Sequence, residues 1–382
     1  MELFGAASGL IDFIWLKVVP FLVVLTIIVF IHELGHYLVA RWNKVKIDAF
    51  AVGFGPEIFG FYDKRGTRWK FCAIPLGGYV KFFGDANGTS LPDYDHLAEM
   101  NADDREGAFE HKNVWQRASV VVAGPVANFL LAIVIYTGLF MFHDDVKIAP
   151  VVGGVVPNSA ASEAGFKTGD RILSINGAEV SAFRDISEVT MLSSGDTLTF
   201  VVDRAGENVT LAATPRMTER EDRFGNTYKI AQIGLQSDTS PENRIVTSLG
   251  PVDAFVKSLS QTWLVIKGTL NFIVELFAGK QEAKELRGPL GIGQMTSQVA
   301  TLGIAQLMSL AGVISISIGL LNLFPIPMLD GGHLAFYAIE AVRGKPLSPK
   351  SMELAFKVGL TCVLALMVFA TTNDIFRLIG MG

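Results

Sequence analysis

Two histidines and a glutamate near the N-terminus have the types and the spacing of a hydrolytic metal site. The residues His32-Glu33-Leu34-Gly35-His36 form the pattern HExxH. On a helix, positions i and i+4 share a face, so His32 and His36 can both offer an imidazole nitrogen to one metal ion. Glu33 would then lie beside a metal-bound water, where a general base is needed. The pattern predicts that His32 and His36 bind zinc and that Glu33 is catalytic.

This motif lies in a segment that is apolar enough to enter a membrane. Residues 18–31, which come just before it, include no charged side chain. Ionisable groups are costly inside a bilayer, and those that occur there usually mark a functional site. The sequence therefore predicts a hydrolytic metal site within the membrane.

The third metal ligand is expected far along the chain. A catalytic zinc ion takes three protein ligands and one water. From Asn322 to His333 the sequence reads NLFPIPMLDGGH. Counted along a helix, Asp330 lies roughly 20 Å and His32 roughly 14 Å from the nearest following arginine, so the two lie at comparable depth. Asp330 is the predicted third ligand, and His333 is the alternative.

Two prolines before Asp330 interrupt the apolar run. Pro325 and Pro327 cannot lie within an ordinary helix, because each removes a donor and clashes with the preceding turn. An unwound stretch at membrane depth is tolerated where it is buried or lines a wet cavity. We therefore expect a substrate-binding cavity at Asn322, Pro325 and Pro327. Asn322 could hold substrate backbone or the developing oxyanion, or it could cap the broken helix.

Composition limits the class of protein. The chain has 382 residues, of which 50% are hydrophobic and 18% charged, and its mean hydropathy is +0.40. That is too apolar for a soluble enzyme. The net charge is −5, and no basic tract suits nucleic acid. The two cysteines are far apart, so no disulfide is expected.

Four stretches are long and apolar enough to span a bilayer. They are residues 18–40, 118–142, 304–329 and 354–372. The first is expected to stay as an uncleaved membrane segment. Residues 252–279 mix charged with apolar side chains and suit an amphipathic helix in the membrane interface. We expect a multi-pass α-helical membrane protein with four spans.

The distribution of basic residues predicts the orientation. They cluster between positions 41 and 81, just before the second span, and between the last two spans. Such clusters face the cytoplasm. The metal site should therefore lie toward the cytoplasmic side, and the segment from about 144 to 287 should lie outside.

Residues 147–215 read as a separate small β-rich domain, with short β-branched runs between Gly, Asn and Asp. The resulting division is 1–143 for the first two spans with HExxH and a β-prone loop, 147–215 for the inserted domain, 216–300 for a linker and the interfacial helix, and 301–382 for the last two spans.

Three motifs together resemble one known family. HELGH, the later NLFPIPMLDGGH and an intervening GPVANF at residues 124–129 resemble the site-2 protease family, most closely its bacterial RseP-type members. The similarity covers nearly the whole chain. It implies that His32, His36 and Asp330 are zinc ligands and that Glu33 is the catalytic base.

The resemblance also implies roles for residues outside the three-ligand set. Asn322 would contact the substrate or the transition state. Gly124 and Asn128 would belong to a packing motif near the site, and we count Asn128 among the candidate substrate contacts. Small residues such as Gly124 permit close helix approach.

Two further regions match features of the family. Residues 157–177 resemble a PDZ domain of the bacterial protease type, of which this chain has one copy, and such domains bind chain ends by strand addition. Residues 71–83 are β-prone and suit a hairpin that dips into the membrane, where an edge could pair with an unwound substrate.

The resemblance implies that the substrates are single-span membrane proteins, such as an anti-sigma factor, that another protease has already trimmed. It places the protein in the bacterial inner membrane. The process would be regulated intramembrane proteolysis in an envelope stress response. The PDZ-like domain would then be periplasmic. Two alternatives remain: a PDZ-bearing scaffold with a vestigial metal site, and a zinc transporter, although few intramembrane charges exist to carry an ion.

Overall fold

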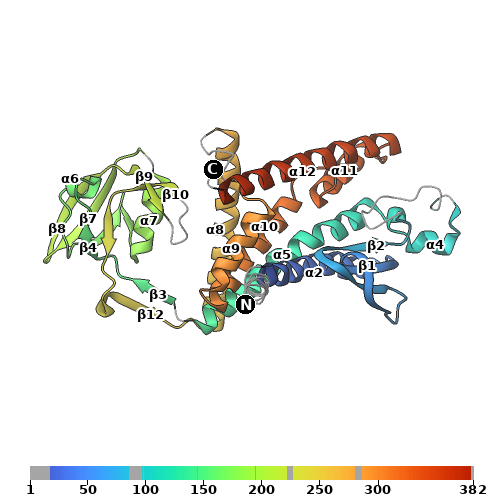
Figure 1. The fold of residues 1–382 in the computed structure, drawn as a ribbon, viewed down its shortest axis with the longest axis horizontal. Helices are drawn as coiled ribbons and strands as arrows, with labels where there is room; N and C mark the ends of the chain where they lie inside the picture. Colours follow the sequence, from blue (N-terminus) through green and yellow to red (C-terminus); the bar gives the residue numbers. More distant parts are fainter. Residues whose placement is uncertain are drawn as a thin grey trace, which may run out of the picture. The chain divides into compact units, whose positions relative to one another are not determined.

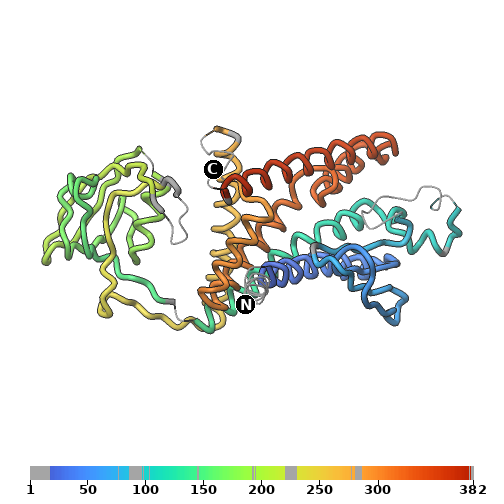
Figure 2. Tube along the Cα trace, in the orientation of Figure 1, coloured from blue at the N-terminus to red at the C-terminus, as the bar shows by residue number. Residues whose placement is uncertain are grey.

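The computed structural model describes residues 18–85, 97, 99–143, 145–193, 195–221, 227–279 and 286–379. Contacts divide the chain into two units. The first comprises the residues up to Leu139 and those from Ala254 onward, and the second is Phe140–Asp253. Figures 1 and 2 trace the chain out of the first unit through α5 and back into it through α8.

Four helices of the first unit could cross a membrane by their length and composition. They are α2 (Val19–Trp42), α5 (Val114–Phe142), α10 (Ile304–Asn322) and α12 (Pro349–Leu378). Each overlaps one of the four predicted stretches. The third prediction was too long, because α10 ends at Asn322 and not at residue 329. Pro325 and Pro327 prevent its continuation.

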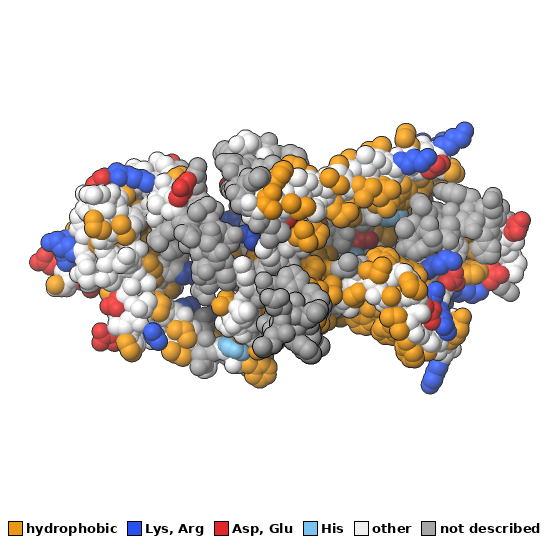
Figure 3. All heavy atoms as spheres, in the orientation of Figure 1, with side chains coloured by type: hydrophobic (Ala, Val, Ile, Leu, Met, Phe, Trp, Pro, Cys, Tyr) orange, Lys and Arg blue, Asp and Glu red, His pale blue; other side chains and the backbone are white. Residues whose placement is uncertain are grey.

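Shorter elements complete this unit: α4 (Ala102–Gly107), the 3₁₀ helix η2 (Phe109–His111), α9 (Pro289–Ala300) and α11 (Asp330–Arg343). Figure 3 shows hydrophobic side chains along the long helices of this unit, whereas charged ones gather at the end that carries the β1–β2 turn and the start of α12. This distribution is typical of helices in lipid with one wet end.

A long hairpin packs against α2. Its strands are β1 (Ile47–Tyr62) and β2 (Arg68–Phe82), which pair antiparallel. Residues near its base, such as Phe50 and Val80, are buried in a core shared with α2 and α5, while Ile58 and Phe59 near its tip are exposed. The β-prone segment predicted at residues 71–83 overlaps most of β2. The sequence gave no bounds for β1.

The turn of the hairpin is organised by Asp63. Its carboxylate accepts hydrogen bonds from the backbone of Arg65 and Thr67, at 2.8 and 2.9 Å, and from the hydroxyl of Tyr37 at 2.8 Å. Burial alone would raise the pKa of Asp63, but the bonds from Thr67 and Tyr37 outweigh it and lower that pKa to about 2. The ionised carboxylate therefore fastens the turn to α2.

Asp63→Asn should destabilise the hairpin at neutral pH by about 1–2 kcal/mol, because the amide is a weaker acceptor than the carboxylate. The folded pKa is depressed, so the contribution is complete above the ordinary value of 3.8 and is lost as the pH falls through about 2. Thermal unfolding of both proteins in detergent, followed down the pH scale, measures this. A stability gap that stays constant to pH 2 would contradict the role given to Asp63.

In its described residues the second unit contains short strands, the α-helices α6 (Ala160–Glu163) and α7 (Phe183–Leu192), and the 3₁₀ helix η3 (Pro241–Asn243). A four-stranded sheet has the order β6-β5-β7-β8, and its side chains Ile172, Phe200 and Val202 lie fully buried in the core. The strands of this unit are β3 (Asp145–Ile148), β4 (Val152–Val155), β5 (Arg171–Ile175), β6 (Ala178–Glu179), β7 (Leu198–Arg204), β8 (Glu207–Ala213), β9 (Arg216–Glu221), β10 (Thr227–Gln232), β11 (Leu235–Ser237) and β12 (Arg244–Thr247).

This unit extends beyond the predicted domain of residues 147–215. β11 pairs with β4, and β12 pairs with β3. Ile233, from the segment expected to be a linker, is buried in the same core as Val152. Residues 216–253 therefore belong to the inserted unit and not to a linker. Their partners are far away in sequence, so local patterns gave no sign of the pairing.

The segment expected to lie in the membrane interface forms the helix α8 (Pro251–Phe277). In Figure 1 it runs across the direction of α2 and α12. One face contacts α5, where the hydroxyl of Thr137 donates to that of Ser258 at 2.9 Å. Large apolar side chains, among them Phe255 and Trp263, are exposed. An interfacial position remains a prediction.

Candidate metal centre and active site

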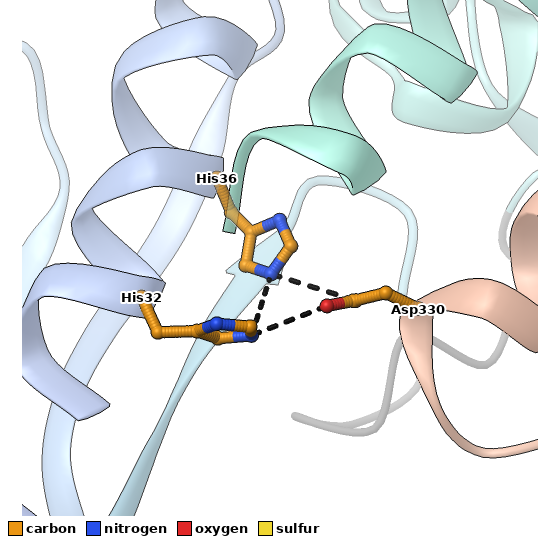
Figure 4. A group of neighbouring side chains, drawn as sticks. All are labelled: His32, His36 and Asp330. Carbon is orange, nitrogen blue, oxygen red and sulfur yellow. Dashed lines mark hydrogen bonds and ion pairs between the residues drawn. The ribbon is translucent and has the colours of Figure 1, made fainter. Parts of the chain in front are cut away.

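His32, His36 and Asp330 meet, although almost 300 positions separate the histidines from the aspartate. Nε2 of His32 lies 3.2 Å from Oδ2 of Asp330, and Nε2 of His36 lies 3.5 Å from Oδ1. The two Nε2 atoms are 3.2 Å apart. Figure 4 shows the three side chains converging from α2 and from the start of α11. Among the described residues, this is the group of His, Cys, Asp and Glu side chains that could hold a metal ion.

The surroundings of this group fit a zinc ion. All three ligand atoms lie within 4.8 Å of one another, and two imidazole nitrogens with one carboxylate are a donor set that zinc takes in catalytic sites. Both histidines are 8% exposed. Oδ2 of Asp330 is buried, and apart from its 3.2 Å approach to Nε2 of His32 it has no partner among the described residues. A buried acceptor of this kind is costly unless a cation or donor satisfies it.

Close packing of α2 on α5 brings the histidines into place. A Cβ atom on Gly35 would lie 2.4 Å from the carbonyl oxygen of Ala123 on α5. In return, a Cβ on Gly124 would lie 2.3 Å from Nε2 of His36 and 2.9 Å from Cε1 of His32. Each helix therefore has a glycine where the other needs room.

The stretch after α10 is folded tightly to place Asp330. Asp330 is the first residue of α11 and follows Leu329, which is extended. Cβ atoms on Gly331 and Gly332 would lie 2.3 and 2.4 Å from carbonyl oxygens of the preceding turn. Met328 has a φ of 88°, a conformation that costs energy for a residue with a side chain. The glycine pair is thus required by this turn.

A cavity of about 270 Å³ opens onto the three residues. Glu33 and Asn322 line it, as does the β2 segment from Gly77 to Val80. The backbone of Val80 hydrogen-bonds the Glu33 carboxylate. A carboxylate, a side-chain amide and a strand edge therefore surround the ligand group, and these are groups that peptide hydrolysis could use.

Three of the predicted substrate contacts lie elsewhere. Pro325 and Pro327 are not among the described residues that line the cavity. They belong to the turn between α10 and α11. The carbonyl oxygen of Pro327 packs closely against α12, because a Cβ on Gly359 would lie 2.0 Å from that oxygen. Asn128 is fully buried behind His32. Pro325 is exposed and Pro327 half-buried, so a contact of either with substrate stays a prediction, whereas the buried side chain of Asn128 offers no open surface.

The alternative ligand, His333, also lines the cavity but does not join the ligand group. One helical turn beyond Asp330, its ring packs 5.3 Å from that of Phe356. A contact that the sequence did not predict is made by Val120, whose carbonyl oxygen lies 2.9 Å from Nδ1 of His36. Because every residue has a backbone carbonyl, the sequence does not show which one accepts this hydrogen bond.

Comparison with known protein families adds a decisive observation. Residues 20–366 match Peptidase family M50. The chain belongs to peptidase family M50. This membership agrees with the resemblance to site-2 proteases and supports a zinc metalloprotease.

Curated relatives match this M50 peptidase along its length. A protein of Agrobacterium fabrum with the provisional name zinc metalloprotease Atu1380 is 47% identical over 380 residues, covering 100% of both chains. The similarly named R01501 of Rhizobium meliloti is 46% identical, covering 98% of this chain and 100% of its own. Metalloprotease MmpA of Caulobacter vibrioides is 38% identical, covering 95% and 96%.

Among solved structures, the PDZ domain of the SdrC-like protein Lmo2051 from Listeria monocytogenes matches with 19% identity and a TM-score of 0.19, covering 25% of this chain and 88% of that one. The PDZ-like character of the inserted unit therefore stays a prediction from the sequence.

Proposed function

We propose that this M50 peptidase is a zinc protease that hydrolyses a peptide bond within the membrane span of a single-span protein. The observation that carries the proposal is the meeting of two histidines, an aspartate and a glutamate in one cavity among helices that could cross a membrane. A catalytic carboxylate in such surroundings is difficult to explain by a structural role.

His32, His36 and Asp330 would hold the zinc ion. When bound, zinc polarises the scissile carbonyl and makes the attacking water more acidic. Glu33 takes the proton from that water and later delivers it to the leaving amine. Asn322, at the end of α10, donates a hydrogen bond to the carbonyl oxygen as negative charge develops on it.

The substrate has to unwind before it can be cut, because a helix hides its carbonyl groups in internal hydrogen bonds. β2 offers a partner for the unwound segment. In the later part of β2, residues 78–81 pair with residues 49–52 of β1 along one edge. No described strand pairs with the other edge there, and Gly77 to Val80 line the cavity. Strand addition at this edge would hold an extended substrate beside Glu33.

The inserted unit, as a PDZ-like domain, would bind the end of a trimmed chain on the periplasmic side of a bacterial inner membrane. A cavity of about 120 Å³ lies between α7 and the segment from Ile230 to Leu235, which is the kind of groove that strand addition uses. The substrates would be anti-sigma-type proteins first cut by another protease. α8 would lie in the interface.

Cleavage of a reporter protein with a single membrane span tests the proposal. Purified protein in detergent should cut the reporter within the span, a zinc chelator should stop the reaction, and added zinc should restore it. Mass spectrometry of the fragments locates the cut. Cleavage only in the soluble parts of the reporter, or cleavage indifferent to the chelator, would overturn the proposal.

A further inference from the structure

One face of α5 packs against both histidines. Val120, Gly124 and Asn128 follow one another at intervals of four residues and so lie in a row along the helix. The first supplies a carbonyl oxygen to His36, the second leaves room for both rings, and the third contacts His32. Val120 and Asn128 thus each approach the Nδ1 atom of one histidine, whereas the Nε2 atoms of both face Asp330.

The contact with His36 determines which of its nitrogens can bind a metal. The Val120 oxygen, 2.9 Å from Nδ1 of His36, can only accept a hydrogen bond, so Nδ1 carries the proton. Nε2 then has a free lone pair and faces Asp330. Histidine ligands of metal ions usually donate their second ring N–H to such an acceptor, which fixes the ring and its tautomer.

His32 needs an equivalent acceptor, and Asn128 is the residue in position to supply it. The amide nitrogen of Asn128 lies 3.2 Å from Nδ1 of His32. The side chain is fully buried, and its oxygen is without a hydrogen-bond partner among the described residues. The oxygen and nitrogen of an amide exchange places by a half-turn that leaves the shape unchanged. After that exchange the oxygen faces Nδ1.

We propose that Asn128 is a positioning residue for the metal centre: its side-chain oxygen accepts the Nδ1 proton of His32 and so leaves Nε2 free to bind the metal ion. Donation from the amide nitrogen would instead require the lone pair at Nδ1 and place the ring proton at Nε2, where the metal must bind. The proposal rests on the proposed function of the site, and it replaces the substrate contact first expected of Asn128.

The zinc affinity of the full-length protein, measured in detergent by competition with a chromogenic chelator, tests this role. Asn128→Leu keeps the approximate size of the side chain without an acceptor and should weaken zinc binding roughly 10- to 100-fold. Asn128→Asp keeps the acceptor and should bind zinc at least as tightly as the native protein. Ser315→Ala is the control: it removes a 2.8 Å hydrogen bond to the backbone oxygen of Asn128 and should leave zinc affinity unchanged.

The two substitutions at position 128 separate this role from simple packing. Equal loss of zinc from the Leu and Asp variants would overturn the proposal, and so would native affinity in the Leu variant. If thermal unfolding shows that the Leu variant does not fold, the Asp variant decides alone: a tenfold or greater loss would mean that Asn128 acts as a donor. A native protein that binds no zinc would instead contradict the proposed function.

Discussion

Replacing Glu33 by glutamine should stop peptide-bond cleavage while the protein keeps its zinc. Glu33 lines the same cavity as the ligand group but is not part of it. Glutamine has almost the same shape, so the cavity and the ligands should remain, but it cannot accept the proton of the attacking water. General-base catalysis contributes roughly 10²- to 10⁴-fold, and the cleavage rate should fall by that factor.

Two measurements on the same preparation check this result: the cleavage rate of a single-span reporter and the zinc content by mass spectrometry. Glu353→Gln is a matched control. Glu353 lies on α12, its side chain is 67% exposed, and it pairs with Lys357 one turn away, so its loss should leave the rate unchanged. Cleavage at the native rate by the Glu33 variant would show that another group is the base.

The second large effect is expected from one methyl group at Gly124. In Gly124→Ala the new Cβ would lie 2.3 Å from Nε2 of His36 and 2.9 Å from Cε1 of His32, closer than atoms can approach without movement. The imidazoles would have to turn away from Asp330, or α5 would have to withdraw from α2. Either movement separates the ligand atoms, so zinc affinity should fall at least about tenfold and cleavage should fall with it.

Gly138→Ala is the control for this experiment. Gly138 lies on the same helix, and a Cβ there would meet no described atom within 4 Å. It adds the same methyl group and the same gain in helix propensity, so both zinc affinity and cleavage should be retained. If the two alanine variants bind zinc equally well, the histidines do not depend on the room that Gly124 leaves.

The parts of this molecule that sequence could predict are those with strong local patterns. HExxH is a helical pattern, and the helix α2 presents His32 and His36 on one face as expected. The four apolar stretches are helices because lipid-compatible segments must satisfy their own backbone groups. Asp330 could be predicted because a carboxylate at the depth of the two histidines is costly unless it serves a site.

Most other contacts between distant segments could not be predicted from such local patterns. The predicted inserted domain ended at residue 215 because nothing local shows that β11 returns to pair with β4. Pro325 and Pro327 form the turn that places Asp330, a role that the sequence did not specify, and their expected contact with substrate stays a prediction. The acceptor for His36 is the backbone of Val120, which any residue could supply.

The central claim is that His32, His36 and Asp330 bind one zinc ion together. Anomalous X-ray scattering at the zinc edge, from crystals of the zinc-loaded protein, tests it most directly. We predict a single strong peak at bonding distance, about 2.0–2.2 Å, from Nε2 of both histidines and from a carboxylate oxygen of Asp330. A zinc peak bound elsewhere, with the three side chains free of metal, would contradict the account.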